Sequence, residues 1–425
     1  MSFNKLTSLE KGMRLYGRKK TDPRQVRILK NDIENDFIRY ADMFHKAGEQ
    51  IAIHLLDQKN EDIYQLDTFF YPLTFIYRHC IELVLKAIGF KCITSKAERK
   101  NFINETFHNL KKIYDEVDKL YSVSLPQDQK DWVSKFLKNI SMIDAASDSF
   151  RYPFYIVSEK DFFGNDTYSL QRLFEKQTNI DLVKLSYKFE AAFSILWNWY
   201  YETTYSSTKY QELSTVFLEE GGSYYSMAVV GYGYRKEDFL PYTDAYCETA
   251  GFLRNHMERL FEEAKYNEAS IYFIPMCYLY RNCVELAEKA ILFEETDKSI
   301  DEKCAIVNKY KHSIEMLWKS IKTDAYKCWS ASEFPQTMAL IEQYCAELHT
   351  FDPQAIRFRY PINRNIDLAF NENQWFDYGR TSEFFEGLIN VFQGIEAELS
   401  EMRSIKAEME AELELEMRDA INDYY

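Results

Sequence analysis

The longest apolar pattern in the chain runs from Phe69 to Ile88, with the sequence FFYPLTFIYRHCIELVLKAI. Apolar residues would occupy every side of this stretch in a helix, which is typical of a buried helix rather than a surface one. Pro72 falls in its expected first turn, where a missing backbone donor does little harm. Arg78 and Glu82 would point into the interior from one helical face, within reach of each other.

The same pattern returns from Tyr272 to Ile291, as YFIPMCYLYRNCVELAEKAI. Other blocks recur in the same order, including DFIRYAD as DFLPYTD, FHNLKKIYDEV as KHSIEMLWKSI, and FRYP unchanged. Ordered recurrence over several blocks predicts a duplicated unit. His79 has become Asn282 in the second copy, so a function that requires imidazole there is confined to the first. The polar positions that persist form five pairs: Arg78/Arg281, Glu82/Glu285, His108/His312, Arg151/Arg359 and Tyr152/Tyr360.

Each copy is predicted to be mostly helical. Apolar residues recur every three or four positions in Asp36–Leu56, Asp131–Ile143 and Ile180–Tyr200. The exception is Leu213–Tyr234, where two β-rich runs flank Glu-Gly-Gly and predict a β-hairpin. A shorter strand near the N-terminus is left open as its counterpart. The acidic tail, Gly394–Asp419, is predicted to be a long helix whose apolar stripe docks on the bundle or, as the less favoured alternative, on a second chain.

The predicted architecture is a mainly α protein with two tandem helical bundles and a small β-hairpin near the start of the second. The expected segments are an N-terminal segment with a possible short strand (1–35), a first bundle (36–203), a linker with the hairpin (204–240), a second bundle (241–400) and an acidic C-terminal helix (401–425).

Net charge excludes a general attraction to nucleic acid or to anionic lipid, because the chain of 425 residues carries a formal charge of −15. A nucleic-acid contact would have to come from a local patch, such as Arg14–Lys20, or from a cleft. The start of the chain has no apolar core typical of a signal peptide, and no apolar run is long enough to cross a bilayer. We therefore expect no membrane association.

Cysteine usage and motifs indicate a cytoplasmic protein without a metal or a cofactor. The eight cysteines form no CxxC pair and no Cys/His ligand spacing, so they are expected to be reduced. Gly231-Tyr232-Gly233 lacks the third glycine and the following helix of a dinucleotide loop, and no P-loop, GxSxG or HExxH is present.

Two interpretations of the persistent polar set stay open. In the first, which we favour, a buried Arg–Glu pair is satisfied by a histidine and by the tyrosine of FRYP, and the set is structural. In the second, arginine and histidine act on RNA, because metal-independent cleavage needs a base for the 2′-hydroxyl proton and a cation for the phosphorane. His108 bonded to Glu82 deep inside the bundle would favour the structural role. His108 facing an open cleft beside Arg151 would favour the catalytic one.

These same residues carry a family resemblance. YRHCIELVLKAI, followed by HNL and later by FRYP, resembles the HEPN superfamily, and looks most like bacterial HEPN-like proteins of abortive-infection and other phage-defence systems. The resemblance covers Tyr40–Tyr200 and again Tyr242 to about Ser400. It implies helical bundles that pair, often with endoribonuclease activity at the pair interface, so that one chain would supply both halves as a pseudo-dimer.

One feature of active HEPN ribonucleases is missing from the expected place. They carry an arginine, then four to six residues, then a histidine, whereas Arg78, Arg151 and Arg281 are followed by no histidine at that distance. Arg39 and His45 alone have this spacing, on an earlier helix, and they are interpreted as a surface arginine and a helix histidine.

The hypothesis is therefore a HEPN-like, metal-independent endoribonuclease in phage defence, and the alternative is a non-catalytic HEPN-like scaffold that binds a partner protein or a nucleotide. Partners are RNA or a protein, with a homo-oligomer through helical faces or the C-terminal helix as a further alternative. The candidate site residues are Arg78, His79, Glu82, His108, Arg151, Arg281, Glu285, His312 and Arg359.

Overall fold

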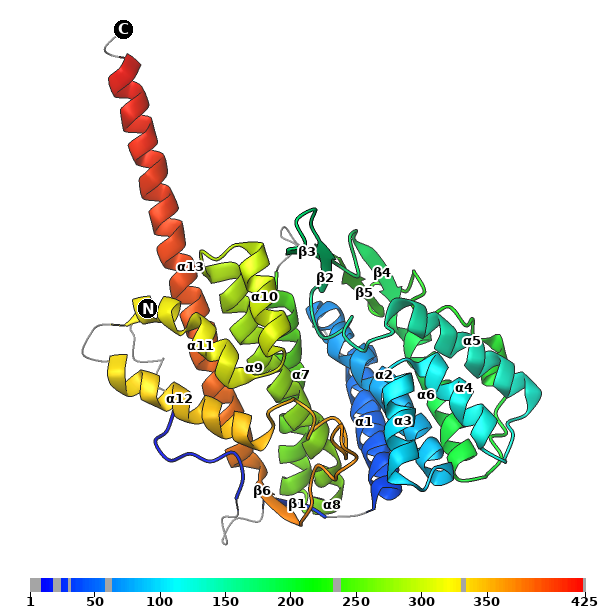
Figure 1. Ribbon diagram of the computed structural model, residues 1–425. Helices are drawn as coiled ribbons and strands as arrows, with labels where there is room; N and C mark the ends of the chain where they lie inside the picture. Colours follow the sequence, from blue (N-terminus) through cyan, green and yellow to red (C-terminus); the bar gives the residue numbers. More distant parts are fainter. Residues whose placement is uncertain are drawn as a thin grey trace.

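The protein is mainly α-helical, with two groups of helices that lie side by side (Figure 1). The computed structural model describes residues 9–17, 24–29, 32–57, 63–231, 238–329 and 334–422. The helices of the first half are α1 (Ile33–Leu56), α2 (Tyr64–Cys92), α3 (Lys96–Thr106), α4 (Leu110–Leu120), α5 (Gln127–Ile143) and α6 (Leu182–Tyr200). Those of the second half are α7 (Leu240–Glu262), α8 (Tyr266–Ala269), α9 (Phe273–Ala290), α10 (Ile300–Tyr310), α11 (Ile314–Ala325), α12 (Phe334–Phe351) and α13 (Tyr378–Asn422). Short helical turns complete them: η2 (Lys209–Glu212), η3 (Ser270–Tyr272), η4 (Ile291–Glu295) and η5 (Tyr326–Cys328).

The two predicted buried helices are α2 and α9, and each lies at the centre of its half. Helix α2 packs against α1, α4 and α6, and α9 packs against α7, α11 and α13. Every residue of α9 is buried, as the apolar pattern predicts. The prediction for Pro72 is wrong, because α2 begins at Tyr64 and the proline lies well inside it. The missing N–H therefore removes one bond from the helix interior, whereas Pro275 does lie in the first turn of α9.

The halves share one continuous hydrophobic core. Helix α2 packs on α7 across the boundary, and the rings of Phe75 and Tyr278 stack at 4.7 Å between α2 and α9. Tyr71 and Tyr242 make a second ring contact, at 4.2 Å. None of the described helices is long and apolar enough to cross a membrane.

Short strands tie the ends of the halves together. Strand β1 (Gln25–Ile28), which precedes α1, pairs antiparallel with β6 (Gln374–Asp377), which precedes α13. Strand β5 (Met227–Val230), which comes before α7, pairs antiparallel with β4 (Thr178–Asp181), which precedes α6. A strand from the start of the first half thus pairs just before α13, the last helix of the second half. A strand from the start of the second half pairs just before α6, the last helix of the first half. A short strand, β1, is therefore present near the N-terminus, where the sequence left one open.

The predicted hairpin over Leu213–Tyr234 is wrong in its pairing, and its residues 232–234 lie outside the described chain. Strand β4 lies between the two β-rich runs, because Ile180 bridges Glu220 on one side and Ala228 on the other. The hairpin that does form was not predicted. It joins β2 (Tyr155–Lys160) to β3 (Asp166–Gln171), two largely exposed strands with little apolar alternation.

Helix α13 crosses the predicted boundary at residue 400 without a break and projects from the body (Figure 1). Leu399 is buried, but the apolar stripe beyond it is exposed at Met402, Ile405, Met409 and Leu413. Docking of this stripe on the bundle, the favoured expectation, is therefore wrong. The body ends near Arg403, whose guanidinium contacts the carbonyl of Glu294 and the carboxylate of Glu295.

Candidate functional site

Four donors surround the buried carboxylate of Glu82 on α2. Its oxygens accept hydrogen bonds from Arg78 at 2.6 Å, Lys86 at 2.6 Å and Tyr360 at 2.7 Å, and the Nδ1 atom of His108 lies 2.9 Å away. We call these five residues the Glu82 cluster. Its tyrosine belongs to the second half of the chain.

The Glu285 cluster on α9 has the same composition. Glu285 accepts hydrogen bonds from Arg281 at 3.4 Å, Lys289 at 2.8 Å and Tyr152 at 2.7 Å, and the Nδ1 atom of His312 lies 2.9 Å away. Here the tyrosine comes from the first half. The FRYP segments are thus exchanged, so that each half completes the cluster of the other.

The helix pattern explains how each cluster is assembled. On α2, Arg78, Glu82 and Lys86 are spaced four residues apart and share a face. The guanidinium of Arg78 also donates to the backbone carbonyl of His108, which fixes the loop between α3 and α4. The guanidinium of Arg281 does the same for the carbonyl of His312, at 2.7 Å.

The residue before each of these histidines has a strained backbone. Phe107 has φ 47° and Lys311 has φ 51°, a region that L-residues seldom adopt. Each ends a helix, α3 or α10, by donating its N–H to the last turn. Strain of this kind costs of order 1–3 kcal/mol, and it is frequent at functional sites. Phe107 is also 63% exposed.

Both histidines open onto a single cleft between the halves, with a volume of about 460 Å³. The side chain of His108 is 32% exposed and that of His312 is 31% exposed. The chain is acidic, but the cleft is lined by five cations against two carboxylates. The cations are Lys112, Arg151, Lys311, Arg359 and Arg364, and the carboxylates are Glu105 and Asp148.

The contacts of the histidines determine their protonation. A carboxylate only accepts, so Nδ1 of His108 carries the proton toward Glu82, and Nδ1 of His312 carries the proton toward Glu285. Nε2 is then the unprotonated nitrogen, and it has no hydrogen-bond partner among the described residues. Burial lowers the pKa of both histidines below the ordinary value of 6.5, although the neighbouring glutamate opposes this shift. Both imidazoles are therefore neutral at neutral pH.

The glutamates are charged despite being fully buried. Burial alone would raise the pKa of Glu82, but Lys86, His108 and Arg78 together hold it well below its ordinary value. Lys289, His312 and Arg281 have the same effect on Glu285. Each histidine therefore has a charged carboxylate behind it, which is itself paired with an arginine and a lysine.

The two buried arginines of the cleft, Arg151 and Arg359, differ in how far they are neutralised. Arg151 pairs with Asp148 at 3.1 Å and donates to the Asn282 amide oxygen at 3.2 and 3.3 Å. Arg359 has no carboxylate within ion-pair distance in the described part of the chain. Its guanidinium lies over the rings of Phe75 and Tyr360, at 5.5 and 5.2 Å. Arg359 is therefore the cation that is more available to an anion.

Not every predicted site residue reaches the cleft. His79 is completely buried, where its Nε2 lies 2.8 Å from the backbone carbonyl of Arg359 and its ring stacks on Phe75. It does not line the cleft. Arg39 pairs with Asp36, and His45 pairs with Glu190 on α6. Arg39 and His45 therefore pair with different carboxylates and not with each other. This agrees with their interpretation as a surface arginine and a helix histidine.

Several residues of the site were not selected from the sequence. Lys86 and Lys289 recur at matching positions of the repeated sequence pattern, which is the same signal that the chosen residues give. Arg78 has a second ion-pair partner, Asp144, whose Oδ2 lies 3.0 Å from the Arg78 Nε atom. The sequence also marks this residue, because Asp144 and Asp352 stand at the same distance before the two FRYP segments. Lys112, Lys311 and Arg364 carried no signal, since single exposed cations are common.

One group of carboxylates has ligand atoms close enough for a metal ion, among the described residues: Glu294, Glu295 and Glu396. Glu294 accepts a hydrogen bond from the backbone N–H of Phe239, and Glu295 pairs with Arg403. These contacts already engage two of the three carboxylates, and the group does not line the cleft. The absence of a metal stays a prediction.

Comparisons with family models, with curated proteins and with solved structures found no match for this chain.

Proposed function

We propose that the cleft is a metal-independent endoribonuclease site, in which His108 and His312 act together on one phosphodiester. The observation that carries this proposal is the sharing of one basic cleft by two histidines, each with Nδ1 directed to a buried carboxylate. This arrangement supplies two imidazoles with a fixed tautomer and an available Nε2. The proposal agrees with the family resemblance, including its role in phage defence.

The chemistry follows the usual course of RNA cleavage without a metal. Nε2 of one neutral histidine takes the proton of the ribose 2′-hydroxyl, and the 2′-oxygen forms a bond to phosphorus. The bond from phosphorus to the 5′-oxygen breaks, and the other histidine gives a proton to that oxygen. Because both imidazoles are neutral in the free protein, this second histidine must first take up that proton from solvent. The products are a 2′,3′-cyclic phosphate and a 5′-hydroxyl. General acid–base catalysis of this kind contributes about 10²–10⁴-fold.

The cations have separate tasks in this scheme. Arg359, which is unneutralised, stabilises the charge that develops on the phosphorane oxygens. The exposed Lys112, Lys311 and Arg364 hold flanking phosphates, so that RNA is attracted locally despite the net charge of −15. The exposed ring of Phe107 offers a surface on which a base next to the scissile phosphate stacks.

The test is to incubate the purified protein with end-labelled RNA in the presence of EDTA. Wild-type protein is expected to cleave RNA to 2′,3′-cyclic phosphate ends and to leave DNA of the same sequence intact. His108→Gln and His312→Gln are each expected to lower the rate by about 10²-fold or more. His256→Gln, on α7 and outside the cleft, is the matched control and should keep the wild-type rate.

Three outcomes would contradict the proposal. They are cleavage that persists in the double variant His108→Gln, His312→Gln, equal cleavage of DNA, and no cleavage of any RNA by wild-type protein. Circular dichroism of each variant shows whether a lost activity reflects lost folding.

A second candidate is the non-catalytic scaffold. It is favoured by Glu82, whose contacts with Arg78, Lys86, His108 and Tyr360 are those of a satisfied structural network. His108 meets both conditions set out from the sequence, because it bonds to Glu82 and also lines the cleft beside Arg151. Binding of RNA or a nucleotide without cleavage would support this scaffold role.

A further inference from the structure

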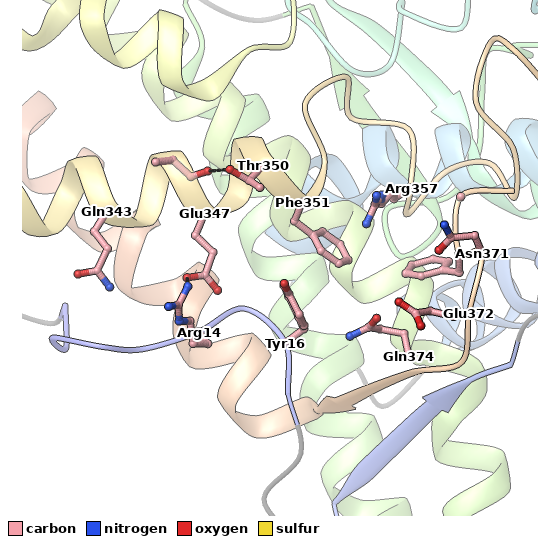
Figure 2. A pocket seen from close by; sticks show the side chains of 13 residues that line it. Arg14, Tyr16, Gln343, Glu347, Thr350, Phe351, Arg357, Asn371, Glu372 and Gln374 are labelled. Carbon is pink, nitrogen blue, oxygen red and sulfur yellow. Dashed lines mark hydrogen bonds and ion pairs between the residues drawn. The ribbon is translucent and has the colours of Figure 1, made fainter. Parts of the chain in front are cut away.

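A second pocket, larger than the cleft and separate from it, lies beside α12. It has a volume of about 590 Å³, within the range of about 300–1,000 Å³ typical of small-ligand sites. The N-terminal segment, α12 and the loop that leads to β6 enclose it (Figure 2). We call it the Tyr16 pocket, and six of its lining residues offer rings or polar groups to a ligand: Tyr16, Phe351, Arg357, Asn371, Glu372 and Gln374. None of its lining residues lines the cleft.

Aromatic rings form the middle of this pocket. The ring of Tyr16 lies 5.3 Å from that of Phe351, and 45% of Tyr16 is exposed. Figure 2 shows both rings directed into the pocket from opposite walls, the N-terminal segment and α12. An exposed tyrosine beside a second ring is a surface on which a flat heterocycle stacks.

A cation lies beside these rings. The guanidinium of Arg357 is 4.8 Å from the centre of the Phe351 ring. It forms no ion pair within the part of the chain that the structure describes. Arg14, at the other end of the pocket, is instead neutralised by Glu347 at 3.1 Å. Arg357 is thus the cation that is available for an anionic group, and a guanidinium suits a phosphate.

The remaining polar groups lie on the same side as Arg357. Figure 2 shows Asn371 and Glu372 on the loop and Gln374 at the start of β6, with Arg357 near them and the Tyr16 and Phe351 rings next to them. Carboxamides both donate and accept, as the edge of a nucleobase does, and a carboxylate accepts from the hydroxyls of a ribose. Their side-chain groups form no hydrogen bond to one another.

From these contacts we propose that the Tyr16 pocket binds a purine mononucleotide. The base stacks on Tyr16 beside Phe351 and meets Asn371 and Gln374 at its edge. Glu372 accepts from the ribose hydroxyls, and Arg357 binds the phosphate. This site is independent of the proposed cleavage, because it uses no residue of either cluster. Along the chain the pocket lies next to the cleavage site, because Arg359 of the cleft and Tyr360 of the Glu82 cluster closely follow Arg357.

Calorimetric titration of the full chain tests the proposal, with AMP, GMP, their nucleosides and inorganic phosphate as probes. At least one of the two nucleotides is expected to bind, and its nucleoside and inorganic phosphate are each expected to bind about tenfold more weakly or less, because each offers part of the contacts. Arg357→Gln is expected to weaken the nucleotide about tenfold and the nucleoside little. Tyr16→Ala is expected to weaken both.

Two controls make the result specific. Arg364→Gln removes a charge farther along the same loop, in the cleft, and should leave nucleotide binding unchanged. The double variant His108→Gln, His312→Gln should bind as wild type does, whether or not the protein cleaves RNA.

The proposal would be overturned if neither nucleotide bound, or if Arg357→Gln and Tyr16→Ala both bound as wild type does. Loss of binding in the double histidine variant would place the nucleotide in the cleft and would equally overturn it.

Discussion

Arg78 shows how much one buried side chain holds in place. It is completely buried, and it pairs with Glu82 on its own helix and with Asp144 at the end of α5. It also donates to the carbonyl of His108, in the loop that carries this histidine into the cleft. One guanidinium thus connects α2, the end of α5 and the site.

We therefore predict that Arg78→Ala lowers the free energy of unfolding by about 3–5 kcal/mol, because it leaves Glu82 with a buried charge that has lost a partner. Chemical denaturation measures this change. Arg39→Ala is the matched control, since its pair with Asp36 is partly exposed, and it should cost no more than about 1 kcal/mol. An Arg78→Ala protein with an unchanged unfolding midpoint would refute the structural role of the cluster.

The histidines give a prediction for pH. Burial lowers the pKa of His108 and His312 in the folded protein, so the unfolded chain binds more protons below pH 6.5. These two groups therefore make the folded state less stable as the pH falls through 6.5 toward their folded pKa values. Proton NMR of the imidazole C–H signals should show both titrating below 6.5, and a midpoint above 6.5 for either would contradict this assignment.

At the scale of elements, the short strands decide how the halves connect. Gly231 ends β5 with φ +77°, and a Cβ there would lie 2.2 Å from the carbonyl oxygen of Lys176, just before β4. Gly231 comes this close to Lys176 because β5 pairs with β4. In the predicted hairpin, the same residues would instead have paired with the segment that begins at Leu213.

Gly231→Ala is accordingly predicted to destabilise the protein far more than Gly164→Ala. Gly164, in the turn between β2 and β3, has a similar φ of +84° with open space around it. Its substitution should cost about 1–2 kcal/mol for the backbone alone. Gly231→Ala adds a clash with backbone worth roughly 1–3 kcal/mol more. Equal melting temperatures for the two variants would contradict the β4–β5 pairing.

The helices were largely predictable from the sequence, and the pairing of segments was not. Helices α1, α2, α6 and α9 follow from three-and-four periodicity or from apolar residues on every side, which are local signals. Strand β4 has four residues and merges into α6, so it shows no pattern of its own. The sequence does not mark the starting position of α2, because Tyr64–Thr68 is mixed in polarity and a proline such as Pro72 is typical of a first turn.

The candidate site could be predicted in its members but not in its assembly. The repeated positions mark every member of both clusters, including the lysines, although the lysines are not among the candidate residues chosen from the sequence. Two copies of FRYP give identical local signals, so the sequence alone does not tell which copy supplies the tyrosine to which glutamate. Likewise, the exposure of His108 and the burial of its neighbour His79 depend on packing between the halves.

For the whole molecule, exchange of the FRYP segments is the feature on which the proposed function depends. Tyr360 reaches the Glu82 cluster, and Tyr152 reaches the Glu285 cluster. The exchange brings Arg151 and Arg359 into one cleft with both histidines. The proposed cleavage needs Arg359 and both histidines in the same cleft.

The most direct test is the titration of His108 and His312 by NMR in two variants, with the signals assigned by His108→Gln and His312→Gln. The Tyr360 hydroxyl lies 2.9 Å from Nδ1 of His108 and donates to Glu82. The Tyr152 hydroxyl lies 3.3 Å from Nδ1 of His312 and donates to Glu285. Removing either hydroxyl therefore changes the surroundings of one imidazole and shifts its pKa. Tyr360→Phe should therefore shift the pKa of His108 and leave that of His312 unchanged, and Tyr152→Phe should do the reverse. The opposite pattern, in which each tyrosine affects the histidine of its own half, would contradict the exchange and the shared cleft.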